Sequence, residues 1–89
     1  MSLDEKENKM DKEFNDFVKN EIAFRLRCKP EEVYTVWQCK TLQNIKGLFS
    51  SDVESAKGLY FEATYNGDKE ELYLVMYSKV SNEAIQVAF

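Results

Sequence analysis

Apolar residues near the N-terminus recur at spacings of three and four, which is the period of an amphipathic helix. Between about residue 11 and residue 28, one stripe collects the side chains of Met10, Phe14, Phe17, Val18, Ile22 and Leu26. Pro30 disfavours helical geometry at Lys29, so the helix should stop by Cys28 or Lys29. We expect four residues of this stripe to lie in the core: Phe14, Phe17, Val18 and Ile22.

After Pro30 the pattern changes from a helical to a strand period. The segment "VYTVWQCKTLQNI" is rich in β-branched and aromatic residues, and "LYFEATY" alternates as a strand covered on one face does. Asn66-Gly67 is a strong hairpin signal that joins this second segment to "ELYLVMYSKV". The polar "SNE" then turns the chain into "AIQVAF", with Ile85, Val87 and Phe89 on one side.

These elements predict an α+β fold, with one N-terminal helix packed across a four-stranded antiparallel sheet in sequential order. The charged and aperiodic residues 1–10 are expected to be a flexible lead-in, and residues 11–89 a single domain. One helical stripe and one alternating sheet face suffice to bury each other in a single small core.

Composition narrows the range of functions. The 89 residues are 44% hydrophobic and 31% charged with a net charge of −4, which argues against a nucleic-acid surface. No apolar run is long enough to span a bilayer, so we expect a soluble cytoplasmic protein unless a signal peptide was removed. Without histidine, Cys–His and Ser–His catalysis and Cys/His zinc sites are excluded. Cys28 and Cys39 are interpreted as free thiols, and no metal or cofactor is expected.

The stretch "AKGLYFEATYNGDKEELYLVMYSKVSNEAIQVAF" resembles the cystatin superfamily, in particular the single-domain stefins. A glycine, an aromatic strand, a Gly-Asp turn, a strand ending in an aromatic residue and Lys, a loop and a short last strand follow in the same order. The resemblance implies a helix on a curved sheet and inhibition of papain-like cysteine proteases. In that family a Gln-x-Val-x-Gly motif in the first hairpin enters the protease cleft.

Two short segments compete for the position of that motif. They are Gln43–Gly47 and Glu54–Gly58, and the resemblance implies partner contacts from Gln43, Ile45, Gly47, Ser55, Lys57 and Gly58. The first hairpin is then longer by about one motif, with its tip at Leu48–Val53, and Gln43–Gly47 lie inside a strand. The second loop, Val80–Glu83, would add Ser81 and Asn82, but it lacks the usual Pro or Trp, and the N-terminal glycine of the family has no counterpart.

A second surface follows from the residues themselves. Four aromatic side chains could form an exposed patch on the uncovered sheet face: Trp37, Tyr60, Tyr73 and Tyr77. Cross-strand aromatic pairs also stabilise sheets by roughly 0.2 to 1 kcal/mol each without any partner, so both interpretations stay open.

We therefore expect a non-enzymatic, cystatin-like protein-binding module, with inhibition of a papain-like cysteine protease as its specific version. The alternative is a small cone-shaped enzyme or ligand binder that uses a buried carboxylate. Glu62 interrupts an aromatic strand, but alternation places it with Tyr60 and Thr64 on the face opposite Phe61. The expected state is a monomer or a dimer that exchanges the first hairpin, with neither nucleic acid nor membrane as a partner.

Overall fold

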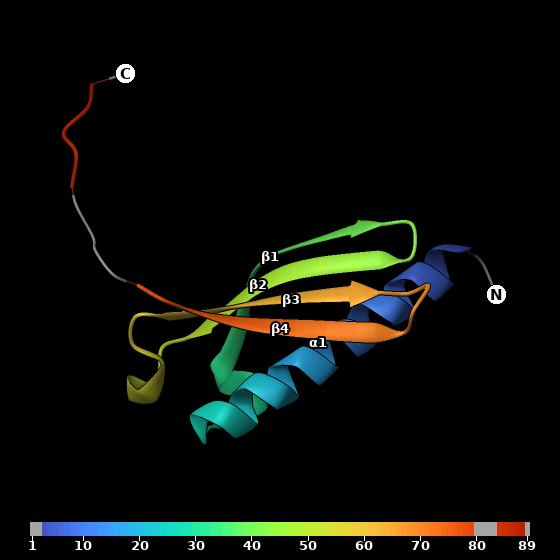
Figure 1. Ribbon diagram of the computed structural model, residues 1–89, viewed down its shortest axis with the longest axis horizontal. Helices are drawn as coiled ribbons and strands as arrows, with labels where there is room; N and C mark the ends of the chain where they lie inside the picture. Colours follow the sequence, from blue (N-terminus) through green and yellow to red (C-terminus); the bar gives the residue numbers. More distant parts are fainter. Residues whose placement is uncertain (1–2, 80–83, 89) are drawn as a thin grey trace.

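The computed structural model describes residues 3–79 and 84–88, with side chains from residue 9 onward. One helix, α1 (Leu3–Leu26), packs against one face of a four-stranded antiparallel sheet (Figure 1). The strands follow the chain in the order β1 (Val33–Thr41), β2 (Asn44–Ser51), β3 (Leu59–Asn66) and β4 (Glu71–Ser78). Two short 3₁₀ turns, η1 (Pro30–Glu32) and η2 (Glu54–Ala56), complete the described elements. The predicted α+β architecture is confirmed.

The helix begins at Leu3, so the predicted helix start at about residue 11 was wrong, and residues 3–10 of the predicted lead-in are helical. Residues 3–9 are mostly Asp, Glu and Lys; Glu and Lys are good helix formers, and acidic residues in the first turn favour the positive end of the helix dipole. The helix ends at Leu26, where Arg27 takes a left-handed φ of 57°. The Cys28 N–H donates to the Ala23 carbonyl at 3.0 Å, which closes the helix in a Schellman-type cap.

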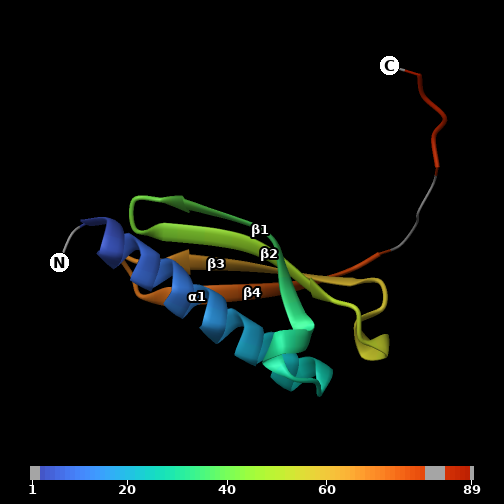
Figure 2. The same ribbon diagram turned by 180° about the vertical axis from the view of Figure 1, so that it is seen from behind.

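The core lies between α1 and the inner face of β1, β2 and β3 (Figure 2). Phe14, Val18 and Ile22 are buried as predicted, and the Phe14 and Phe49 rings meet with centroids 6.1 Å apart. The prediction for Phe17 was wrong, because its side chain is 53% exposed on the flank of the helix. The apolar stripe is wider than the contact surface that the sheet offers it.

The first hairpin turns earlier than predicted. "VYTVWQCKTLQNI" is not one strand, because β1 and β2 meet at a two-residue turn, Leu42–Gln43, in which Leu42 has a φ of 55°. Leu48 pairs with Trp37 in the middle of the hairpin, so the predicted tip at Leu48–Val53 was also wrong. Leu-Gln has none of the Gly, Asn or Asp residues that mark such turns, and the sequence therefore gave no sign of it.

The predicted last strand, "AIQVAF", does not join the sheet over its described residues 84–88. This segment is extended and leads away from the sheet, and Ile85 and Val87 are 75% and 62% exposed (Figure 1). The sheet still has four strands because the first predicted strand divides into β1 and β2. Phe89 and the loop Val80–Glu83 lie outside the described residues.

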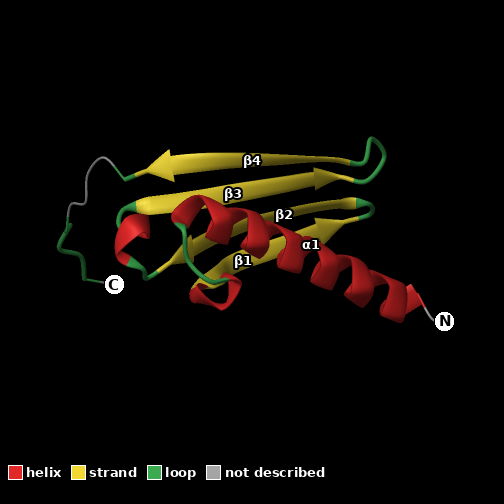
Figure 3. Ribbon diagram, turned by 90° about the horizontal axis from the view of Figure 1, so that it is seen from below, coloured by secondary structure: helices red, strands yellow, loops and turns green. Residues whose placement is uncertain are grey.

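A β-bulge and one helical side chain fix how α1 lies on β1. The register shifts between Thr35 and Trp37, which leaves Val36 as the extra residue and brings both Thr35 and Gln38 to the inner face. The Asn15 side-chain amide donates to Thr35 Oγ1 at 2.7 Å and to Gln38 Oε1 at 2.8 Å. This clamp holds the helix toward β1, and α1 crosses the strands diagonally (Figure 3).

The contrast between Phe49 and Phe17 gives a direct test of this packing. Phe49→Ala should lower the free energy of unfolding by about 3 to 5 kcal/mol, because it empties a fully buried site. Phe17→Ala should cost about 1 kcal/mol or less, since half of its ring already contacts water. Urea denaturation of both variants checks this, and equal losses would contradict the described core.

Candidate functional site

The sheet face opposite α1 is covered by none of the described elements (Figure 2). Antiparallel register places Tyr60 opposite Tyr77 and Thr64 opposite Tyr73, while Trp37 heads a cross-strand row that continues through Leu48. Five aromatic residues on this side are between 38% and 53% exposed, and we call them the outer aromatic face: Tyr34, Trp37, Tyr60, Tyr73 and Tyr77. The predicted patch of four is brought to one face, and Tyr34 extends it.

Trp37 reaches this face because of the bulge. Strand alternation alone would place residues 35 and 37 on the same side, and Thr35 faces inward to the helix. The extra residue Val36 reverses the alternation, so that Trp37 turns outward beside Leu48. The side on which the single tryptophan lies is thus a property of the bulge.

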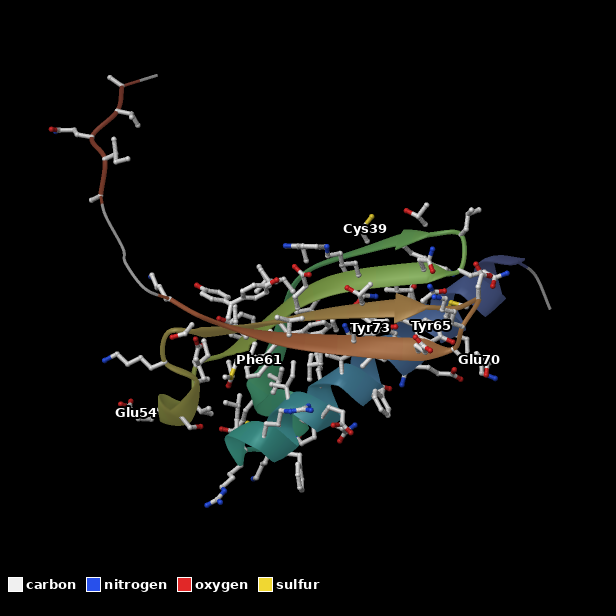
Figure 4. All side chains as sticks on the ribbon, viewed as in Figure 1. Cys39, Glu54, Phe61, Tyr65, Glu70 and Tyr73 are labelled. Atoms are coloured by element: carbon white, nitrogen blue, oxygen red, sulfur yellow. The ribbon has the colours of Figure 1, made fainter. Side chains whose placement is uncertain are left out.

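Two polar contacts lie on the outer face among these aromatic rings. Lys46 Nζ lies 3.4 Å from Glu62 Oε1, and Glu62 sits in the cross-strand row between Leu48 and Val75. Glu62 is therefore on the face that alternation predicted, paired with a cation and not buried as a lone acid. The Tyr73 hydroxyl donates a hydrogen bond to Glu71, and this bond raises the pKa of Tyr73 (Figure 4).

The first candidate inhibitory segment does not form a loop. Gln43 is exposed in the β1–β2 turn, where its carbonyl accepts a hydrogen bond from the Gly67 N–H at 3.0 Å. Ile45 is fully buried, and Gly47 lies buried inside β2. A Cβ atom on Gly47 would stand 2.9 Å from a Phe49 ring carbon, so this glycine makes room for the core. Of the three predicted contact residues, only Gln43 is available at the surface.

The second candidate segment lies at the other end of the sheet, around η2 (Figure 1). The Ser55 hydroxyl donates to the Leu26 carbonyl at 2.9 Å, which ties η2 to the end of α1. Gly58 has a φ of 77° where the chain enters β3, and its carbonyl accepts the Lys79 N–H at 2.7 Å. Lys57 is exposed beside it, whereas Ser81 and Asn82 fall outside the described residues. The two candidate motifs therefore occupy opposite ends of the sheet.

A groove that sequence reasoning missed runs between the first half of α1 and the β3–β4 hairpin. Its volume is about 610 Å³, and its apolar lining includes Met10, Phe17 and Leu72. Tyr65 contributes to the lining, and Glu70 lies at the hairpin turn near the start of the helix (Figure 4). A repeat of apolar residues every seven positions, Met10, Phe17 and Phe24, is the sequence signal for this second helical flank.

The two free thiols of the described residues lie in different environments. Partial burial raises the pKa of the Cys28 thiol, and the nearby carboxylates of Glu32 and Glu31 raise it further. The raised pKa lowers the fraction of Cys28 that is present as the nucleophilic thiolate. Cys39 is exposed on the outer face (Figure 4). Among the described residues, no group of three or more Cys, Asp or Glu side chains is placed to hold a metal ion.

In the described part of the chain, none of the helices has the length and apolar character needed to cross a membrane. The model of a family of unknown function, DUF6275, matches residues 5–87, and the chain therefore belongs to this family. Neither the curated proteins nor the solved structures include a significant match to the chain.

A substitution of Gly47 tests whether this glycine is needed for core packing. Gly47→Ala should lower the free energy of unfolding by about 1 to 3 kcal/mol, because the new methyl group presses on the Phe49 ring and the Trp37 carbonyl. Lys46→Ala, at the neighbouring exposed position, should change it by about 0.5 kcal/mol or less. Chemical denaturation checks both, and an unchanged stability of Gly47→Ala would contradict the close packing at this position.

Proposed function

We propose that this chain is a non-enzymatic protein-binding module and that its outer aromatic face is the binding surface. The observation that carries the proposal is the gathering of five half-exposed aromatic residues on a sheet face that no described element covers. Tyr and Trp bury large areas while few torsions are frozen, which is why they dominate the energetics of protein interfaces. The partner that fits is a protein with an apolar patch of its own.

The outer aromatic face combines apolar side chains with one ion pair. Leu48 and Val75 lie in the cross-strand row of Trp37, on either side of Glu62, and add apolar surface, with Val75 44% exposed. The Lys46–Glu62 pair lies in the middle of the face and offers both charges for polar contacts. A bound protein would remove water from the aromatic and aliphatic side chains while the ion pair keeps its own partner.

Protease inhibition is the narrower version of this proposal. It is favoured by the position of the two hairpin turns, which lie at one end of the sheet, joined by the hydrogen bond between Gly67 and Gln43. The start of α1 lies near the same end (Figure 1). The packing of Ile45 and Gly47 inside the domain argues against protease inhibition, because Gln43 is then the only one of the three contact residues predicted in this segment that a protease could reach.

A second candidate is the binding of a small apolar ligand in the groove. Its volume of about 610 Å³ falls in the range of small-molecule sites, and Met10, Phe17 and Leu72 are apolar. The carboxylates nearest to it, Glu13 and Glu70, are exposed. This arrangement favours a hydrophobic ligand over carboxylate-based catalysis.

Loss of Trp37 should weaken partner binding without unfolding the domain. The partner is first captured on the immobilised wild-type protein and identified by mass spectrometry. The purified partner is then titrated with each variant by calorimetry. Trp37→Ala should raise its dissociation constant by about tenfold or more, because exposed aromatic anchors of this kind carry much of the binding energy.

The matched control is Phe24→Ala, which removes an 84% exposed aromatic side chain from the helix, away from the sheet face. Its affinity for the same partner should equal that of the wild type, and thermal melts should show both variants folded. Equal affinities for Trp37→Ala and the wild type would refute the outer aromatic face as the binding surface.

A protease assay tests the narrower version. Papain titrated with excess protein should keep its activity, since the backbone at Gly47 is enclosed by β1 and β3 and cannot enter a cleft. If the wild type inhibits papain stoichiometrically and Gln43→Ala does not, the turn Leu42–Gln43 is instead the segment that binds the protease cleft.

A further inference from the structure

None of the described residues pairs with the outer edge of β4. β4 is the last strand of the sheet, and the described residues 84–88 do not pair with it. Its eight residues, Glu71–Ser78, contain no proline and no bulge, and Glu71 is the only charged one. Natural sheets protect exposed edges with charges, prolines or bulges, as the other edge strand here does at Val36 and Lys40. An edge of this kind presents unpaired N–H and C=O groups to which another strand can bond.

The inner face beside this edge is also apolar, and it is only partly covered, since Leu72 and Leu74 are half-buried against the core. Helix α1 packs mainly on β1, β2 and β3, so Met76 on β4 stays 60% exposed. The flank of α1 that lines the groove adds Phe17, which is 53% exposed. A surface that continues the sheet beyond β4 would cover these two side chains.

The β4 sequence is complementary to itself in one antiparallel register. If Val75 lies on a two-fold axis and pairs with Val75 of a second copy, residues whose numbers sum to 150 face each other across the strands. On the inner face Leu74 meets Met76, and on the outer face Tyr73 meets Tyr77.

The ends of the same register match in charge. Glu71 of each copy faces Lys79 of the other, so that two ion pairs close the interface. Lys79 is exposed, and its backbone N–H is held by the Gly58 carbonyl at 2.7 Å, which fixes where the strand ends. An axis at Leu74 instead places Glu71 opposite Tyr77. An axis at Met76 places Glu71 opposite residue 81, beyond the end of β4. In both registers the match between Glu71 and Lys79 is lost.

We infer that two copies of this chain pair through their β4 edges, with Val75 at the two-fold axis, and form a continuous eight-stranded antiparallel sheet. A two-fold axis perpendicular to the sheet leaves both helices on the same side. The inner residues Leu74 and Met76 of both copies then form the floor between the two α1 flanks. This interface leaves Trp37, on β1, free for a different partner.

A lysine at the axis tests the register. Val75→Lys places two ammonium groups opposite each other in the dimer, whereas in a monomer the new lysine faces Glu62 of its own sheet. Val36→Lys is the matched control, with the same substitution at a similar exposure, 46% against 44%, on the opposite edge strand. Sedimentation equilibrium should show a wild-type dimer, an unchanged dimer for Val36→Lys, and a dissociation constant raised by about tenfold or more for Val75→Lys.

A charge exchange provides an independent test. Glu71→Lys and Lys79→Glu should each weaken the dimer, because each places like charges at both ends of the interface. The double variant restores opposite charges and should recover the wild-type dissociation constant. Added salt should reduce these differences, as it screens exposed charges.

Three results would overturn the inference. They are a wild type that remains monomeric at every concentration, a dimer that Val75→Lys and Val36→Lys affect equally, and a double charge variant that is no tighter than the single variants. A dimer that exchanges the first hairpin would survive Val75→Lys, and so would a dimer held by residues 84–88. The Trp37→Ala variant should dimerise like the wild type, so the outcome is independent of the proposed binding surface.

Discussion

One helix is too narrow to cover a four-stranded sheet, and the rest of this structure follows from that mismatch. A helix with its side chains is about 10 Å wide, whereas neighbouring strands lie about 4.8 Å apart, so α1 can cover two or three strands. It packs on β1, β2 and β3. Part of the inner face of β4, around Met76, and the groove remain uncovered, and none of the described elements lies on the outer face.

The clamp from Asn15 decides which strands are covered. Its amide bonds to Thr35 and Gln38 hold the helix toward β1, and the bulge at Val36 brings both acceptors to the same side. Because the helix is held at this edge, Phe17 projects into the groove instead of the core. The same bulge turns Trp37 outward, so one local irregularity shapes both the buried and the exposed surface.

The proposed binding surface and the proposed dimer interface lie on different uncovered parts of the sheet. The outer aromatic face is centred on Trp37 and the cross-strand row of Leu48, whereas the dimer uses the backbone edge of β4 around Val75. Tyr73 and Tyr77 lie where the two surfaces meet, so self-association would extend the aromatic face across two copies. Membership of a family of unknown function leaves this division of roles to be tested by the variants of Trp37 and Val75.

The sequence by itself determined the elements whose signals are local and strong. The spacing of Phe14, Val18 and Ile22 predicted the helix and its buried stripe, Asn66-Gly67 predicted the second hairpin, and alternation predicted the outward side of Tyr60 and Glu62. The aromatic patch could therefore be predicted in outline.

Tertiary contacts alone decided the rest. Leu42–Gln43 turns the chain without turn residues because β1 and β2 pair along their whole length, and residues 84–88 remain outside the sheet despite their alternation. Neither the exposure of Phe17 nor the burial of Gly47 is encoded in a local pattern. Both depend on where one helix comes to rest on four strands, which is set by packing between residues far apart in the chain.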